Sequence, residues 1–344
     1  MTVRHGREFL SIPGPTNVPD AVLAAMHRPA IDIYSGEMVD TTMSCLEDLK
    51  KIFRTDGNTY IYAANGHGAW EAALTNSLSR GDKVLVLACG LFAIVWGDMA
   101  TKLGLDVEIL PERSRRAVDP DALRERLARD GDGAIKAVLT VQVDTASGVV
   151  NDIPALRKAM DDAGHDALLM VDTIASLGCM TFEMDAWRVD VTVAGSQKGL
   201  MVPPGLSFVA ANERALERPK AADMVTRYWD WTERDGPEHY MKHCGTAPEH
   251  LLFGLRKSLD MILDEGLENV TRRHTLLADA TRAAVACWAQ DGALEMNITE
   301  NAERANSLTT VRMNGIDAAP LLAFCKDECG VIVGIAIGPD ISGK

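Results

Sequence analysis

Short apolar runs alternate with amphipathic stretches over most of the chain. The apolar runs are rich in Val, Ile and Leu, and they predict strands at residues 59–63, 83–88, 107–110, 135–142, 167–171, 189–194 and 206–210. Stretches with helical spacing lie between them, among them residues 69–78, 120–128 and 153–163. Buried strands that alternate with helices indicate βαβ units. We therefore expect an α/β fold with a mostly parallel sheet covered by helices on both faces.

The pattern changes after Pro248. One long helical stretch runs to Gly266, a second covers residues 267–289, and a smaller α/β section follows. In this section the pattern predicts strands at residues 307–313 and 331–337 with a helix at 318–326 between them.

This change of pattern predicts two domains. We expect a large domain over residues 1–255, with an N-terminal arm at 1–20, and a smaller C-terminal α/β domain over 256–344. The strand at 331–337 is expected to be buried, yet the sequence stops at Lys344. Because no further element is left to cover that strand, we expect the smaller domain to be incomplete and the native chain to continue.

Composition and charge narrow the class of protein. The 344 residues include 49 acidic and 35 basic side chains, with a formal charge of −14, and 47% of them are hydrophobic. Such a chain can bury a sizeable core and is not disordered. Its negative charge argues against nucleic acid or an anionic membrane as a partner. No apolar run approaches the roughly 20 residues that span a bilayer, and the N-terminus lacks a signal-peptide core. We expect a cytoplasmic protein.

The cysteine pattern agrees with that compartment. The seven cysteines are odd in number, and the closest pair, Cys325 and Cys329, is spaced CxxxC rather than CxxC. We interpret them as small buried thiols of a reducing environment. His, Cys and carboxylate residues do not show the spacing of a zinc site, so we expect no metal.

Three groups of residues follow predicted strands and carry the candidate chemistry. They are Asn65-Gly66-His67-Gly68, Asp172 and Gly195-Ser196-Gln197-Lys198. Each alone has an ordinary interpretation, as the glycines of a turn, a capping carboxylate and a solvated lysine. Together they fall at the carboxyl edge of one parallel sheet, where α/β proteins bind ligands. A phosphate-binding helix start, a buried carboxylate and a lysine are what pyridoxal 5'-phosphate (PLP) requires.

A resemblance to a known family rests on five segments. They are Pro13-Gly14-Pro15-Thr16, Asn65-Gly66-His67, Val171-Asp172-Thr173-Ile174-Ala175-Ser176-Leu177-Gly178, Gly195-Ser196-Gln197-Lys198-Gly199-Leu200 and Pro203-Pro204-Gly205-Leu206. In this order they resemble class V aminotransferases, and among these the alanine/serine–glyoxylate aminotransferase group. The resemblance extends from about residue 10 to the end of the chain. It implies a PLP-dependent transferase of fold type I.

The resemblance also implies roles for single residues. Lys198 is expected to bond to the cofactor aldehyde and to move the proton during transfer, and Asp172 to hold the pyridinium. Ile174 is expected to pack under the ring. The residues implied at the phosphate are Asn65, Gly66, His67 and Gln197. His67 has an alternative interpretation as a structural residue of the helix start.

Three further positions match the family at single residues. Phe92, in Gly90-Leu91-Phe92, falls where the family stacks an aromatic ring on the cofactor; the alternative is an ordinary core Phe. Thr145 matches a hydroxyl that contacts the phenolic oxygen of the cofactor; the alternative is a turn residue. Gly14 is expected to contact the substrate.

The segment from His243 to Pro248 resembles the one that reaches the phosphate of the other subunit. Thr246 matches it, whereas the family usually has a tyrosine at the position of His243. Imidazole can also donate a hydrogen bond to phosphate. The resemblance therefore implies a homodimer with a shared active site.

Other departures concern the substrate. Family members often carry a His-Arg pair where this chain has Ile33-Tyr34-Ser35, and they carry a carboxylate-binding arginine in a C-terminal segment that is missing here. Either the sequence is incomplete or the clamp has been lost, and we favour the first. The aromatic residues 227–232 either line the substrate entrance or pack at the dimer interface.

The resulting hypothesis is a ping-pong aminotransferase that moves an amino group from serine or alanine to a small 2-oxo acid, namely glyoxylate. Alternatives are a class V aminotransferase of the phosphonate or pyridoxamine type, a catalytically idle PLP-binding homologue, and a protein that binds another phosphate ligand. The cysteine desulfurase branch is disfavoured because no reactive cysteine loop stands out.

Overall fold

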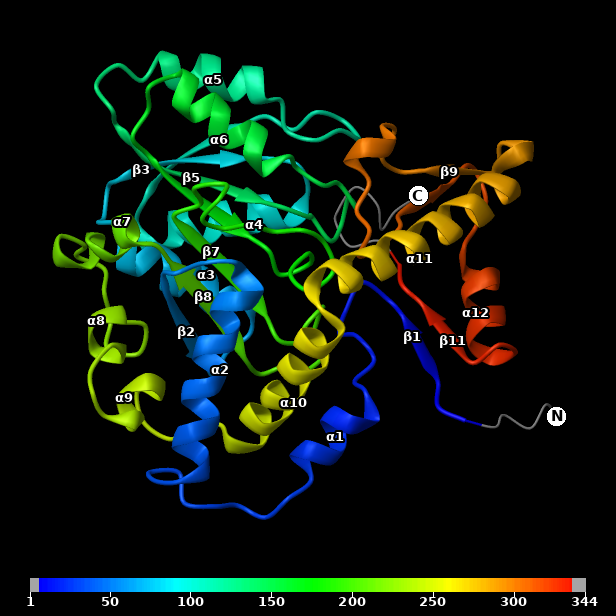
Figure 1. The fold of residues 1–344 in the computed structure, drawn as a ribbon. Helices are drawn as coiled ribbons and strands as arrows, with labels where there is room; N and C mark the ends of the chain where they lie inside the picture. The colour runs from blue at the N-terminus through cyan, green and yellow to red at the C-terminus, as the bar shows by residue number, and fades with distance from the viewer. Residues whose placement is uncertain (1–5, 336–344) are drawn as a thin grey trace.

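A seven-stranded sheet forms the centre of the protein in the computed structural model, which describes residues 6–335 (Figure 1). Across the sheet the strand order is β2-β8-β7-β6-β5-β3-β4. The strands are β2 (Asn58–Tyr62), β3 (Lys83–Leu87), β4 (Asp106–Leu110), β5 (Ile135–Val141), β6 (Leu168–Asp172), β7 (Val191–Gly195) and β8 (Ser207–Ala211). Only β8 is antiparallel to its neighbours in this sheet. The predicted mostly parallel α/β sheet is confirmed, with strand ends within two residues of those expected.

Helices cover both faces of this sheet, because the strands are apolar on both sides. The helices are α2 (Glu37–Phe53), α3 (Gly66–Ser77), α4 (Leu91–Leu103), α5 (Pro120–Ala128), α6 (Ile153–Asp162) and α10 (Glu249–Glu265). Side chains of α3 and α4 form one buried apolar cluster with the sheet. Side chains of α2, α5, α6 and α10 form a second cluster on the other face. The two clusters hold the sheet rigid, and the loops at its ends are free to carry chemistry.

The C-terminal part consists of a long helix and short strands. Helix α11 (Leu267–Trp288) leads to the antiparallel pair β9 (Leu294–Met296) and β10 (Val311–Met313). Helix α12 (Ala319–Asp327) precedes β11 (Val331–Val333). The strand predicted at 307–313 is thus confined to its last three residues.

Strand β11 pairs with the N-terminal arm. It lies parallel to β1 (Phe9–Ser11), on the right of Figure 1. The expectation of a buried strand is wrong for residues 331–333, because a two-stranded sheet leaves them partly exposed, and Val333 is 39% exposed. Residues 336–337 of the predicted strand lie outside the described residues. The domain boundary at residue 255 stays a prediction.

Short helices join α10 to the sheet, namely α7 (Glu213–Leu216), α8 (Trp231–Arg234) and α9 (His239–His243), and α1 (Asp20–Met26) packs on α10. Of the helices in residues 6–335, none has both the length and the apolar character needed to cross a membrane.

The cysteines differ in exposure. All seven are free thiols, of which Cys45, Cys89 and Cys179 are buried, whereas Cys287 and Cys329 are exposed. The interpretation as buried thiols is therefore confirmed for three of them and wrong for the two exposed ones.

Candidate active site

The three predicted groups meet at the carboxyl edge of the sheet. Asp172 ends β6, Gly195 ends β7, and Gly66 begins α3 after β2. A Cβ atom added to Gly66 would lie 2.3 Å from Cδ1 of Ile174, so the helix start and the segment after β6 touch. Cγ2 of Ile174 would lie 3.6 Å from a Cβ on Gly195. Ile174 therefore packs between the predicted phosphate turn and the turn that carries Lys198.

Asp172 is a buried carboxylate with two fixed hydrogen bonds. Its Oδ1 accepts the backbone N–H of Ile174 at 2.6 Å, and its Oδ2 accepts the indole N–H of Trp70 at 2.8 Å. Burial raises the pKa of Asp172 to about 7, although both hydrogen bonds and the charge of Lys198 act in the opposite direction. Such a group can share a proton with a basic ring nitrogen near neutral pH.

Lys198 lies under the N-terminal arm. Burial lowers the pKa of its amine, and the neighbouring charge of Asp172 partly opposes this effect. The amine donates a hydrogen bond to the carbonyl of Pro13. Gly14 has a φ of +120°, and a Cβ added there would lie 2.6 Å from the Lys198 Nζ. Only glycine fits there, so the structure places Gly14 directly against the side chain of Lys198.

The arm is also attached to the lysine turn through its backbone. The N–H of Thr16 donates to the carbonyl of Gln197 at 2.9 Å. The side-chain Oε1 of Gln197 is buried and has no hydrogen-bond partner among residues 6–335. An orphaned amide oxygen in this turn indicates that a polar group is missing from the site.

Asn65 organises the start of α3. Its side chain accepts the backbone N–H of His67 at 3.1 Å, and its carbonyl accepts the N–H of Gly68 at 3.0 Å. The His67 ring lies edge-on to Trp70 with 4.6 Å between ring centroids, and burial lowers the pKa of His67. The His67 ring therefore packs against Trp70, in line with the helix-start interpretation. The role of this turn at a phosphate stays a prediction.

Asp144 joins the two segments that carry Phe92 and Thr145. This buried carboxylate accepts the backbone N–H of Phe92 at 2.8 Å and that of Ala146 at 2.9 Å. A Cβ on Gly90 would lie 2.3 Å from the Asp144 Cγ, so the glycine lets the two loops approach. Phe92 is half-buried and Thr145 is buried. Their predicted contacts with the cofactor stay predictions.

Two functional candidates, Trp70 and Asp144, had no role in the sequence analysis. For Asp144 a signal exists, since an Asp followed by Thr-Ala-Ser-Gly is typical of a turn closed by the Asp side chain. For Trp70 there is none, because its partner Asp172 lies 102 residues further along the chain.

His243 ends α9 and contacts α2, and Thr246 follows three residues later. The Nε2 of His243 is 3.2 Å from the Thr42 hydroxyl of α2, and His239 shares the same hydroxyl at 2.9 Å. Burial lowers the pKa of His243 to about 3, so its ring is neutral. Thr246 is exposed. Their role toward a second subunit stays a prediction.

The aromatic segment 227–232 packs on the start of α3. The Trp229 indole N–H donates to Glu71 at 3.1 Å, and its Cη2 would lie 2.9 Å from a Cβ on Gly68. Trp231 is buried and stacks on Tyr60 with 5.4 Å between ring centroids. Both tryptophans thus pack within this chain.

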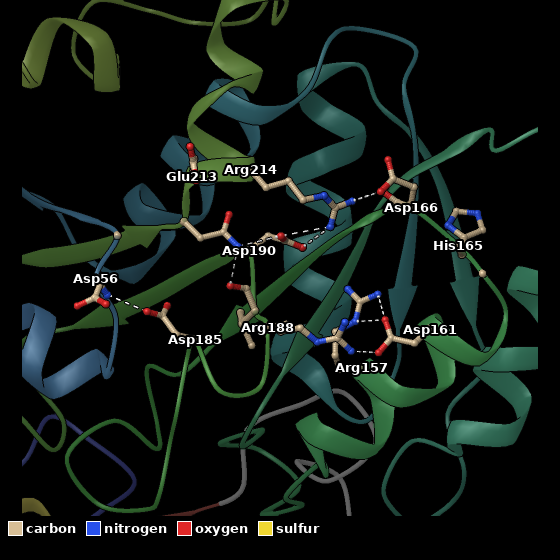
Figure 2. Close-up of a pocket in the computed structure, with 14 residues that line it drawn as sticks. Asp56, Arg157, Asp161, His165, Asp166, Asp185, Arg188, Asp190, Glu213 and Arg214 are labelled. Atoms are coloured by element: carbon tan, nitrogen blue, oxygen red, sulfur yellow. Dashed lines mark hydrogen bonds and ion pairs between the residues drawn. The ribbon is translucent and has the colours of Figure 1, made fainter.

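A cavity of about 830 Å³ lies at the opposite, amino edge of the sheet. Figure 2 shows Arg214 between Asp190 and Asp166, and Arg157 beside Asp161. The N–O distances of these ion pairs are 3.1, 2.9 and 2.7 Å, respectively. Arg214 thus binds two carboxylates, and Asp161 pairs with both Arg157 and Arg188. Because most of the lining residues precede β2, β6 or β7, the cavity is separate from the candidate active site at the carboxyl edge.

The model of the family "Aminotransferase class-V" matches residues 9–339, and the chain belongs to this family. The chain is 40% identical to a serine–glyoxylate aminotransferase of Methylorubrum extorquens. The aligned region covers 100% of this chain and 86% of the relative. It is 37% identical to an L-aspartate–glyoxylate aminotransferase of Paracoccus denitrificans, and this alignment covers 97% of the chain and 83% of the relative. A crystal structure of an alanine–glyoxylate aminotransferase from Nostoc sp. superposes with a TM-score of 0.86 at 27% identity. The superposition covers 98% of this chain and 89% of the Nostoc chain.

The protein is therefore a PLP-dependent aminotransferase of fold type I, as the resemblance implied. The residues present fit this cofactor, because an orphaned Gln197 oxygen, a raised Asp172 pKa and a buried lysine lie at one edge of the sheet. When bound, PLP supplies an electron sink for the substrate carbanion. Lys198 would hold the cofactor covalently and Asp172 would hold the proton on its ring nitrogen. A lowered amine pKa keeps more of Lys198 in the neutral form that can attack an aldehyde and accept a proton.

Proposed function

We propose that this protein moves an amino group from a small amino acid, serine or alanine, to glyoxylate in a ping-pong reaction. The observation that carries this proposal is similarity over nearly the whole chain to relatives that share glyoxylate in their names and differ in the amino donor. The names of these relatives thus agree on the acceptor and differ in the donor.

The site favours a small substrate. The arm from Pro13 to Thr16 is tied to the turn of Lys198, and the backbone of Gly14 contacts the lysine side chain. A small amino acid bound beside Nζ brings its Cα within reach of a base that accepts and returns one proton. The neutral form of Lys198 serves as that base.

We also propose a homodimer with a shared active site in the cytoplasm. The exposed Thr246 supports the dimer, since an exposed side chain is accessible to a partner. The free thiols fit a reducing compartment.

The visible absorption band of bound PLP tests the substrate assignment. L-serine should bleach the band, and glyoxylate should restore it, with one glycine formed for each serine consumed. L-alanine and L-aspartate added separately rank the donors. Bleaching by pyridoxamine together with no response to any amino acid would favour the pyridoxamine type instead.

A further inference from the structure

Trp70 makes the only side-chain hydrogen bond to the Asp172 carboxylate within residues 6–335. It lies one turn into α3, 1% exposed, and its indole N–H donates to the Asp172 Oδ2 at 2.8 Å. The other oxygen accepts the N–H of Ile174 at 2.6 Å. The Ile174 donor lies two residues after Asp172, which ends β6. The Trp70 donor belongs to α3, the helix that begins at the predicted phosphate turn.

The indole is held in place by aromatic neighbours. It stacks on Trp96, with 5.8 Å between ring centroids and 13° between the planes. Phe92 and His67 meet it edge-on, at 6.4 and 4.6 Å. These contacts prevent the ring from turning its N–H away. Trp70 thus connects the phosphate turn, the stacking candidate and the buried carboxylate.

A hydrogen bond to this carboxylate has electrostatic consequences. Asp172 is buried, and the charged groups that act on it are Lys198, which favours its ionised form, and Asp144, which disfavours it. His67 meets the indole edge-on, and burial lowers the pKa of its imidazole. Because the surroundings penalise a buried negative charge, each donor to the ionised form carries more weight than it would in water.

We infer that Trp70 is a positioning residue of the reaction, whose indole N–H keeps the Asp172 carboxylate ionised and fixed in one orientation toward the ring nitrogen of PLP. Trp70 acts through Asp172 and needs no contact with the substrate. Without this donor, the proton between Asp172 and the ring moves toward Asp172, and the ring becomes a weaker electron sink.

Trp70→Phe tests the inference, and Trp96→Phe is its matched control. Trp96 is also fully buried and belongs to the same stack, but its indole N–H has no hydrogen-bond partner among residues 6–335. Both variants replace a buried tryptophan by phenylalanine, and only Trp70→Phe removes the bond to Asp172. Circular dichroism and thermal melting establish that both are folded.

The first readout is the dissociation constant of PLP, measured by adding the cofactor to the cofactor-free chains. We expect it to rise about 10- to 100-fold in Trp70→Phe and less than about 3-fold in Trp96→Phe. The second readout is the pH profile of cofactor binding. The apparent pKa assigned to Asp172 should rise by about one to two pH units in Trp70→Phe and stay unchanged in Trp96→Phe. Equal constants and equal profiles in the two variants would overturn the inference.

A measurement on intact tryptophans keeps the inference testable if Trp70→Phe does not fold. With ¹⁵N-labelled indoles, Asp172→Asn should shift the N–H resonance of Trp70, and Trp96→Phe assigns the neighbouring resonance. No indole resonance that responds to Asp172→Asn would contradict the hydrogen bond itself.

Discussion

The carboxylate of Asp144 accepts the backbone N–H of Phe92 at 2.8 Å and thereby joins the start of α4 to the turn that follows β5. The same carboxylate accepts the N–H groups of Ala146 and Ser147 at 2.9 and 3.1 Å. Burial raises the pKa of Asp144, and these backbone donors act against that effect. One side chain therefore fixes two loops of the candidate active site relative to each other.

Asp144→Ala should destabilise the protein by about 2–4 kcal/mol, because it leaves several buried N–H groups without an acceptor. Urea unfolding measures the free energy of unfolding. Asp106→Ala is the control, since its side chain is 59% exposed and its partner Lys83 is 3.5 Å away. The control should change stability by less than about 1 kcal/mol. Equal losses in both variants would contradict the role of Asp144.

Gly14→Ala should impair attachment of the cofactor, because its Cβ would collide with the Lys198 amine. Overpacking of this kind corresponds to a loss of PLP occupancy of about 5- to 100-fold. The control is Gly6→Ala, where φ is +112° and no atom lies within 4 Å of the added Cβ. Both variants carry the strain of a positive φ, and only one meets the lysine. The PLP absorbance per chain distinguishes them, and full occupancy in Gly14→Ala would be inconsistent with the observed packing.

Asp172 should make the stability of the cofactor-free chain depend on pH. Its folded-state pKa is raised from 3.8 to about 7, so the protonated carboxyl is favoured by folding. This contribution is fully present below pH 3.8 and is lost as the pH rises through about 7. Relative to Asp172→Asn, the wild-type chain should lose about 2–4 kcal/mol between pH 4 and pH 8. Urea unfolding at both pH values measures the difference, and a constant difference would show that the carboxyl is not perturbed.

Subunit mixing tests the shared active site. Lys198→Ala and a His243→Ala/Thr246→Ala double variant should each be inactive or weak alone. After unfolding and refolding together, half of the dimers are hybrids with one intact site each, so about a quarter of the wild-type activity should return. Activity equal to the sum of the separate variants would mean that each chain builds its own site.

The sequence was most informative where burial is continuous. Runs such as residues 83–88 are apolar on both faces, and this is the pattern of a central parallel strand. Strand β1 has three residues and no such pattern. Its pairing with β11 was not predictable because the partner lies more than 300 residues away. The same pairing explains why residues 331–333, expected to be buried, are partly exposed.

The candidate site was predictable only in part for a related reason. Asp172 and Lys198 follow strands, and strand ends of a parallel sheet meet at one edge. Trp70 lies inside a helix, where a tryptophan normally indicates core packing, and its hydrogen bond to Asp172 depends on how α3 lies on the sheet. The residues near Trp70 in the sequence do not determine that geometry.

The most direct test of the account is to reduce the PLP-loaded protein with sodium borohydride and to map the labelled peptide by mass spectrometry. Reduction makes the bond between the cofactor and its lysine permanent. The account predicts a single pyridoxyl group, on Lys198, and none in Lys198→Ala. A label on another lysine, or no label on a protein that has bound PLP, would contradict it.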